Sequence, residues 1–208
     1  MDLRPLPVGY APARRLPQLA GGLALYGASM AMQVRGNLGL APWDVLHQGL
    51  DRLLPLSFGQ VTAVTGVVVL LLWIPLRQRP GIGTVANVVV IAFAVDAVLA
   101  LLPTDPSLPV RIGLMVGGIV LNGVASAIYI GTRLGPGPRD GLMTGLAART
   151  GWSIRLVRTG IELAVLVVGW LLGGTAGIGT VLYALAIGPL TQLFLRPFTV
   201  RSPAATPA

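Results

Sequence analysis

The sequence predicts an all-α membrane protein with six transmembrane helices, arranged as two inverted-topology three-helix repeats, each with a short interfacial or re-entrant helix. The composition, the number of apolar stretches and a match of the chain to itself support this fold class. Hydrophobic residues make up 54% of the 208 residues, and the mean hydropathy is +0.78. Only 11% of the residues are charged, against about 25% in soluble globular domains.

Six apolar stretches are long enough, or nearly so, to cross a bilayer, which takes about 20 residues in a helix. They are 17–34, 57–76, 82–102, 112–130, 156–172 and 178–195. These stretches divide the chain into a cytoplasmic N-terminal tail (1–16), a single membrane domain (17–198) and a cytoplasmic C-terminal tail (199–208).

The distribution of arginine predicts how the spans are oriented. With the N-terminus in the cytoplasm, the outer segments hold three of the 15 arginines, which are Arg35, Arg52 and Arg111. The other 12 fall in inner segments: Arg4, Arg14, Arg15, Arg77, Arg79, Arg133, Arg139, Arg149, Arg155, Arg158, Arg196 and Arg201. Cytoplasmic loops of membrane proteins carry an excess of positive charge. The pattern therefore favours six spans with both termini inside.

A shift of 96 residues places the second half of the chain on the first half without a gap. The motif GIGTV at 81–85 recurs at 177–181, and its glycines favour close helix packing. Repeat one covers 17–102 and repeat two covers 113–198, with three spans in each. Because three is an odd number, the second repeat enters the membrane from the opposite side. Inverted repeats of this kind are typical of secondary transporters.

Each repeat contains a polar segment, LGLAPWDVLHQGL at 38–50 and LGPGPRDGLMTGL at 134–146. Pro42 suits the first position of a helix, and Asp44 in the first turn is favoured by the helix dipole. A helix over 42–54 is about 20 Å long, which is too short to span. It lies on the interface or enters the membrane as a re-entrant segment. Two re-entrant segments from opposite faces would converge near the midplane.

The residues that we expect along a substrate path are polar or break the helical pattern within apolar sequence. They are Pro42, Trp43, Asp44, His47, Gln48, Asn87, Asp96, Pro138, Arg139, Asp140, Thr144 and Glu162. Ionisable groups inside a span are costly and mark functional sites. Other interpretations stay open: Asp44 and Asp140 also suit helix capping, Glu162 suits an i,i+4 pair with Arg158, and Asn122 suits an interhelical hydrogen bond.

Several classes of activity lack the residues they need. The chain has no cysteine and one histidine, which argues against a metal site. It shows no nucleophile–base pair and no phosphate-binding loop, so we expect neither an enzyme nor a bound cofactor. The net charge of +8 comes from arginines spread between apolar runs, which argues against nucleic-acid binding. The expected partners are the lipid bilayer and a small solute. Six short spans bury little surface, which leaves a homodimer as an open alternative.

Three runs carry a resemblance to a known group: NLGLAPWDVLHQGL (37–50), SFGQVTAVTGVVVLLL (57–72) and GIGTVANVVVIAFAVD (81–96). With them the chain resembles the bacterial YczE-like membrane proteins, within the broader YczE/YyaS/YitT group. The match is close over the first repeat and looser over the second. The resemblance implies a multi-spanning protein of the bacterial inner membrane and brings no substrate with it.

These features favour a small secondary transporter or exporter of an unidentified solute. Two alternatives remain open. In a channel, the two short helices would surround a continuous polar pore. In a non-transporting scaffold or accessory subunit, they would lie on the surface, and no polar cavity would exist.

Overall fold

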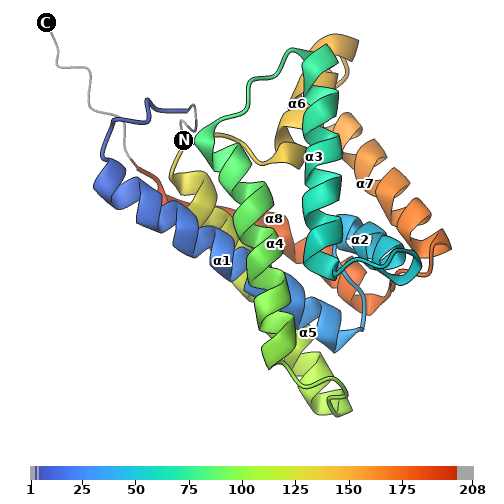
Figure 1. Ribbon diagram of the computed structural model, residues 1–208. Coiled ribbons are helices and arrows are strands. Elements are labelled where there is room, and N and C mark those ends of the chain that lie inside the picture. Colours follow the sequence, from blue (N-terminus) through green and yellow to red (C-terminus); the bar gives the residue numbers. More distant parts are fainter. Residues whose placement is uncertain (1–2, 4, 201–208) are drawn as a thin grey trace, which may run out of the picture.

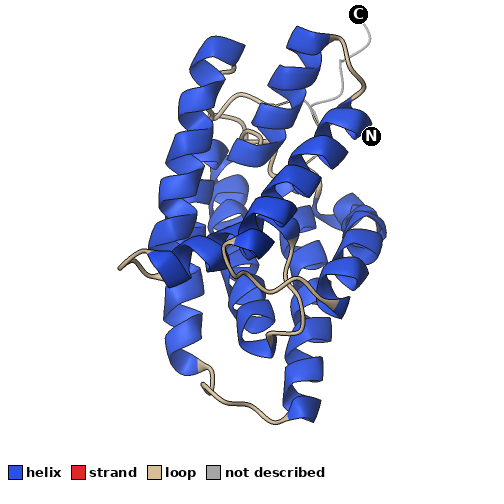
Figure 2. Ribbon diagram, turned by 90° about the vertical axis from the view of Figure 1, so that its right-hand side faces the viewer, coloured by secondary structure: helices blue, strands red, loops and turns tan. Residues whose placement is uncertain are grey.

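The computed structural model describes residue 3 and residues 5–200, and over these residues all regular secondary structure is helical (Figure 2). Arg4 and residues 201–208, which include Arg201 and most of the predicted C-terminal tail, lie outside the described part. The described helices are α1 (Pro12–Gly36), α2 (Pro42–Leu53), α3 (Phe58–Leu76), α4 (Ile82–Leu101), α5 (Leu108–Gly131), α6 (Pro138–Thr150), α7 (Ile154–Leu171) and α8 (Ile178–Phe198).

Each helix of the first half begins 96 residues before a helix of the second half. The starts are 12 and 108, 42 and 138, 58 and 154, and 82 and 178. The short helices α2 and α6 begin with a proline at the first helical position, where the missing N–H costs no hydrogen bond.

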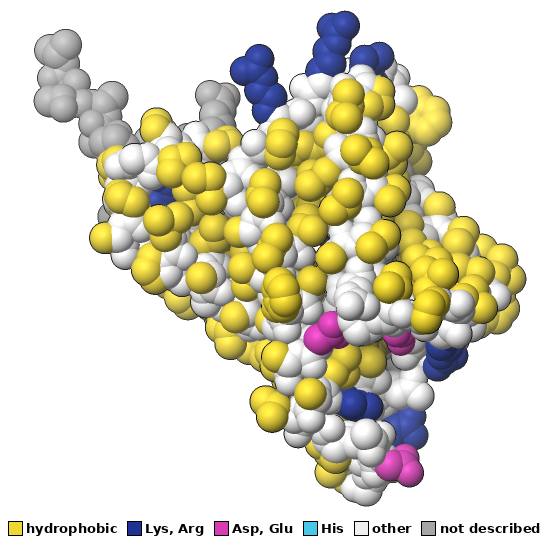
Figure 3. All heavy atoms as spheres, viewed as in Figure 1, with side chains coloured by type: hydrophobic (Ala, Val, Ile, Leu, Met, Phe, Trp, Pro, Cys, Tyr) yellow, Lys and Arg dark blue, Asp and Glu magenta, His cyan; other side chains and the backbone are white. Residues whose placement is uncertain are grey.

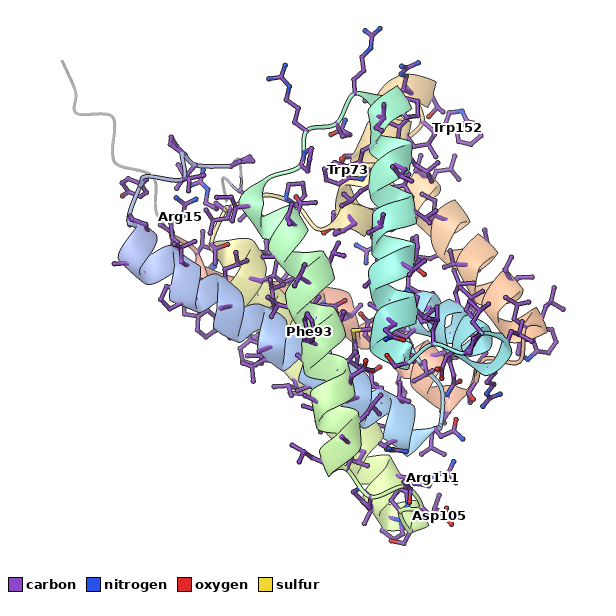
Figure 4. The ribbon with its side chains drawn as sticks, in the orientation of Figure 1. Arg15, Trp73, Phe93, Asp105, Arg111 and Trp152 are labelled. Carbon is purple, nitrogen blue, oxygen red and sulfur yellow. The ribbon has the colours of Figure 1, made fainter. Side chains whose placement is uncertain are left out.

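Helices α1 and α5 pack side by side in opposite directions, and each begins beside the end of the other. Arg15, near the start of α1, donates to the Thr132 carbonyl at the end of α5 at 2.7 Å. Arg111, near the start of α5, donates to the Gly36 carbonyl at the end of α1 at 2.9 Å. The two arginines accordingly lie near opposite ends of α1 (Figure 4). Since carbonyls at a helix end lack partners within the helix, each arginine satisfies groups in the other half of the chain.

The GIGTV segments make a second reciprocal contact. The Gly83 amide donates to the Leu134 carbonyl at 3.1 Å, and the Gly179 amide donates to the Leu38 carbonyl at 2.9 Å. A side chain on Gly81 would lie 2.6 Å from the Leu134 oxygen. The glycines therefore allow backbone to meet backbone, as the sequence predicts.

The short helices pack against spans of the opposite half. Helix α3 contacts α6, and α7 contacts α2, while α1, α4, α5 and α8 form a second group, which α4 joins to α3 (Figure 1). Asn122 joins that group internally: its amide donates to Ser29 on α1 at 2.8 Å and accepts from Tyr183 on α8 at 3.1 Å. It thus makes the expected interhelical hydrogen bonds.

Large apolar side chains cover the outside of the protein. Phe93 is 76% exposed and Leu101 is 83% exposed, and Figure 3 shows hydrophobic side chains over most of one face, with charged side chains gathered toward its upper and lower ends. Exposed apolar surface on this scale marks contact with a membrane. Four of the described helices, α3, α4, α5 and α8, are long and apolar enough to span it. The protein is a membrane protein.

Helix α2 buries polar side chains over most of its length. Asp44, His47 and Gln48 are buried together with Trp43 and Val45, whereas Leu53, the last residue of the helix, is 62% exposed. Polar groups at membrane depth need partners inside the protein.

Candidate functional site

A cavity of about 80 Å³, with both polar and apolar side chains in its wall, lies where the beginnings of α2 and α6 meet, and its volume is several times what one water requires. Helices α1 to α6 all contribute to its wall. The lining residues are Tyr26, Trp43, His47, Thr62, Thr65, Gly66, Val69, Asn87, Val88, Ile91, Tyr129, Gly137, Pro138, Arg139 and Asp140.

Arg139 lies between the two short helices. Its guanidinium stands over the Trp43 ring, 5.0 Å from the ring centroid. One of its terminal nitrogens is 3.6 Å from the Asp44 carboxylate. Trp43 and Arg139 occupy equivalent positions in the two repeats, so the repeat places a cation in one half beside an aromatic ring in the other. Such a contact is favourable, and more so where water is excluded.

His47 follows Trp43 by one helical turn and therefore shares its face of α2. Its Nδ1 lies 3.4 Å from the Asp44 carboxylate and 3.3 Å from the Thr62 hydroxyl oxygen. The Thr62 hydroxyl donates its proton to the Phe58 carbonyl, so Nδ1 of His47 is the donor toward Thr62, while the Asp44 oxygen near it has no hydrogen-bond partner among the described residues. The other ring nitrogen, Nε2, is buried and has no hydrogen-bond partner among the described residues.

Asp140, on α6, also lines the cavity. Its carboxylate accepts a hydrogen bond from the Tyr129 hydroxyl at 3.3 Å. The side-chain exposure falls along the wall, from exposed Asp140 through Arg139 at 25% to Asp44 at 3% and His47 at 1%. The side chains that α6 contributes are therefore more exposed than those of Asp44 and His47 on α2.

Seven of the predicted path residues gather here. They are Trp43, Asp44, His47, Asn87, Pro138, Arg139 and Asp140, with Asp44 in contact with the lining residue Arg139. The carbonyl of Pro138 accepts from the Trp73 indole at 2.9 Å, which fixes the start of α6 against α3.

The other predicted residues have local partners away from the cavity lining. Gln48 accepts from the Thr175 amide at 2.7 Å, Thr144 bonds the Gly141 carbonyl, and Pro42 is the first residue of α2. Asp96 accepts from the Ser57 hydroxyl at 2.5 Å and the Gly59 amide at 2.8 Å. Glu162 pairs with Arg158 at 2.9 Å, as the alternative interpretation expects.

Sequence reasoning missed the tyrosines and threonines of the wall. Tyr26 and Tyr129 meet edge to face at 6.0 Å, and Thr62 and Thr65 lie one above the other on α3. The sequence could have indicated Tyr26 and Tyr129, because a tyrosine inside an apolar span needs a hydrogen-bond partner for its hydroxyl.

The wall combines a cation, carboxylates, an imidazole and an indole N–H without a group of acidic or histidine side chains that could hold a metal ion, among the residues described. Such a site suits a small polar or charged solute, held by a few placed polar groups.

The comparisons place the chain in a family. Residues 13–196 match the "Family of unknown function (DUF6198)". An uncharacterized protein of Haemophilus influenzae is 39% identical over 83% of this chain and 79% of its own length. The "Uncharacterized membrane protein YczE" of Bacillus subtilis is 34% identical over 84% of this chain and 80% of its own length. The "Uncharacterized protein YyaS" of the same organism is 24% identical over 84% and 89%. No solved structure matches the chain. The chain therefore belongs to the DUF6198 family of YczE-like membrane proteins.

Proposed function

We propose that the protein is a small secondary transporter of the bacterial inner membrane, with six spans in two inverted repeats and both termini in the cytoplasm. One observation carries the proposal: the beginnings of two short helices, one from each half, meet at a single polar cavity. Since α1 and α5 run in opposite directions, the helices that follow them start from opposite sides. Secondary transporters place substrate sites at such broken segments.

The lengths of the remaining two helices support six spans. Helix α1 has 25 residues and α7 has 18, which correspond to about 37 Å and 27 Å at 1.5 Å per residue. Both are close to the roughly 30 Å thickness of the hydrocarbon core. Most of their charges lie near the helix ends, where long arginine side chains reach the interface.

The shape of the cavity favours a transporter over the alternatives. A cavity wall that is exposed at Asp140 and buried at His47 fits one state of an alternating-access cycle. A channel needs a continuous polar path, and a scaffold needs no polar cavity. The buried first turns of α2 also differ from the surface position that a scaffold predicts.

Accessibility of single cysteines tests this proposal, and the chain suits the method because it contains none. A cysteine in place of Thr65, which lines the cavity, should react with an impermeant maleimide from either side of the membrane as the protein cycles. Val64, which is next to Thr65 on α3 and 51% exposed on the outside of the protein, is the matched control, and we expect it to face lipid and stay unlabelled. Reaction of Thr65→Cys from one side only would contradict alternating access.

Two loop positions test the orientation. Gln78→Cys should react from the cytoplasmic side, and Asp105→Cys, in the loop between α4 and α5, from the outer side. Reaction of both on the same side would contradict the six-span topology.

A further inference from the structure

Resting on the transport function proposed above, we propose that the cavity binds a small carboxylate together with one proton, with Arg139 as the anion ligand and His47 as the proton acceptor. Among the described residues, Arg139 is the single cation in the cavity lining. The inference follows from how loosely Arg139 is held and from what its departure leaves behind.

Arg139 contacts the Trp43 ring and makes no short hydrogen bond among the described residues. The Trp43 ring lies 5.0 Å from the guanidinium carbon, a contact that occupies none of the N–H groups. Its contact with Asp44, at 3.6 Å, is longer than an N–H···O hydrogen bond, about 2.7–3.2 Å. A carboxylate matches the guanidinium edge with two parallel hydrogen bonds, so an incoming carboxylate can replace this weak contact.

Further donors surround the same place. The indole N–H of Trp43, which is 6% exposed, has no hydrogen-bond partner among the described residues. The first turns of α2 and α6 both reach the cavity, and the amides of a helix start carry partial positive charge. Together with Arg139, these groups favour an anionic ligand.

The proton follows from the charge balance. Without the anion, Arg139 compensates Asp44, and His47 is neutral because it is buried. Once Arg139 binds the carboxylate, Asp44 is left at 3% exposure without its cation. Protonation of His47 at Nε2, the nitrogen without a partner, gives Asp44 a new counter-ion through Nδ1 at 3.4 Å. One carboxylate and one proton therefore enter together, and no covalent bond between heavy atoms changes.

The other groups near His47 do not supply this compensation. Helix α3 presents the Phe58 ring and the Thr62 hydroxyl, and α7 packs against α2 through Gly169. Asp140 is already engaged by the Tyr129 hydroxyl and lies within electrostatic range of Arg158 on α7. The remaining titratable groups that face this region are Tyr26 on α1, Tyr129 on α5, Arg139 on α6 and Tyr183 on α8.

Calorimetric titration of the purified full-length protein in lipid nanodiscs tests the inference, with sodium formate as the probe. Formate should bind, and methylammonium chloride or sodium chloride at equal ionic strength should not. Titrations in two buffers of different ionisation enthalpy should show about one proton taken up per formate. The dissociation constant should rise about tenfold per pH unit above the titration of His47. Binding of the cation in preference to formate, or formate binding without proton uptake, would overturn the inference.

Variants separate the two roles. Arg139→Gln should lose formate binding, whereas Arg149→Gln, which changes an exposed arginine on the same helix, should keep it. Asp44→Asn removes the charge that needs compensation, so formate should bind with little dependence on pH. Asp51→Asn, on the same helix, should retain the pH dependence of the native protein.

His47→Gln should bind formate weakly at every pH and take up no proton. If that variant does not fold, His47→Met introduces the residue found at the equivalent position, Met143, and should behave in the same way. Asp140→Asn should leave proton uptake intact. Loss of proton uptake in Asp140→Asn, or its persistence without His47, would refute the assignment to His47.

These titrations use no gradient, so they are independent of transport. If formate binds with proton uptake but Thr65→Cys is labelled from one side only, the proposed transport function is wrong and the proposed carboxylate site stands. Alternating access without formate binding would remove only the carboxylate site.

Discussion

Helices α2 and α6 occupy equivalent positions in the two halves, yet different contacts hold them in place. The backbone of α7 packs directly against the backbone of α2 at Gly169. A Cβ atom on Gly169 would lie 2.3 Å from the Leu46 amide nitrogen, so no side chain fits there. Helix α3 instead sends the Trp73 indole against α6, where a side chain on Gly141 would lie 2.0 Å from the ring. Trp73 and Gly169 are repeat equivalents, and so are Val45 and Gly141. At the α3–α6 contact the long helix carries the larger residue and the short helix the glycine, whereas at the α7–α2 contact the long helix carries the glycine.

This difference teaches that the repeat preserves the position of each helix and lets the chemistry diverge. Where α2 carries Trp43, His47 and Gln48, α6 carries Arg139, Met143 and Thr144. A cavity shared by unlike walls can bring the arginine of one half to an aromatic ring and a carboxylate of the other. Two identical walls would bring like charges together, which is unfavourable in a low-dielectric site.

The largest effect is expected at the α3–α6 contact. Trp73→Ala removes a side chain that is 2% exposed and its hydrogen bond to Pro138, and should lower the free energy of unfolding by about 3–5 kcal/mol. Trp152→Ala, at a tryptophan 61% exposed, is the matched control. The double variant Trp73→Gly, Gly141→Val rebuilds the arrangement at Gly169 and should be more stable in thermal unfolding than Trp73→Gly alone. Equal stability would show that the two contacts are not interchangeable.

The paired arginines extend the comparison to α1 and α5. Arg15 is fully buried and donates to five backbone carbonyls, those of Leu6, Pro7, Tyr10, Thr132 and Arg133. Arg111 donates to two, those of Gly36 and Asn37. Hydrogen bonds from a charged group contribute about 1.5–3 kcal/mol, so Arg15→Gln should lower the melting temperature more than Arg111→Gln does. The opposite order in detergent would contradict the assigned contacts.

The backbone contact at α7 should respond to a single added methyl group. Gly169→Ala places that group against the α2 backbone and should cost about 1–3 kcal/mol by overpacking. Gly160→Ala, on the same helix, meets nothing within 4 Å and should not change the melting temperature. A tolerated Gly169→Ala would mean that α2 and α7 separate easily.

The smallest effect is expected at the start of α3. Ser57 caps α3 as Ser153 caps the equivalent helix α7, but Asp96 accepts in addition from Ser57 and Gly59, and Gln192 stands at the position of Asp96. Asp96→Asn should cost about 0.5–2 kcal/mol, as loss of a helix cap does, and leave formate binding unchanged. If Asp96→Asn loses formate binding and keeps its melting temperature, Asp96 belongs to the substrate path and not to the helix cap.

The helices could be predicted from the sequence to within a few residues, because hydropathy and proline positions act locally. Helix α1 begins at Pro12, five residues before the predicted 17, since the first turn includes Arg14 and Arg15. The residues of the cavity wall were only partly predictable. The PWD and PRD segments pointed to four of its lining residues, and His47 and Asn87 were predicted separately, whereas Tyr26 and Tyr129 come from α1 and α5, where the apolar pattern conceals them.

By itself, the sequence determined the membrane class, the position of each helix along the chain and the 96-residue spacing. These properties depend on composition and on near neighbours in the chain. The tertiary structure decided which polar side chains meet. Asp44 contacts Arg139 across 95 residues, and Asp96 turns to a helix start while Asp140 turns to the cavity. Such pairings depend on how whole helices pack, because a side chain's partner is set by the helix face that lies opposite it.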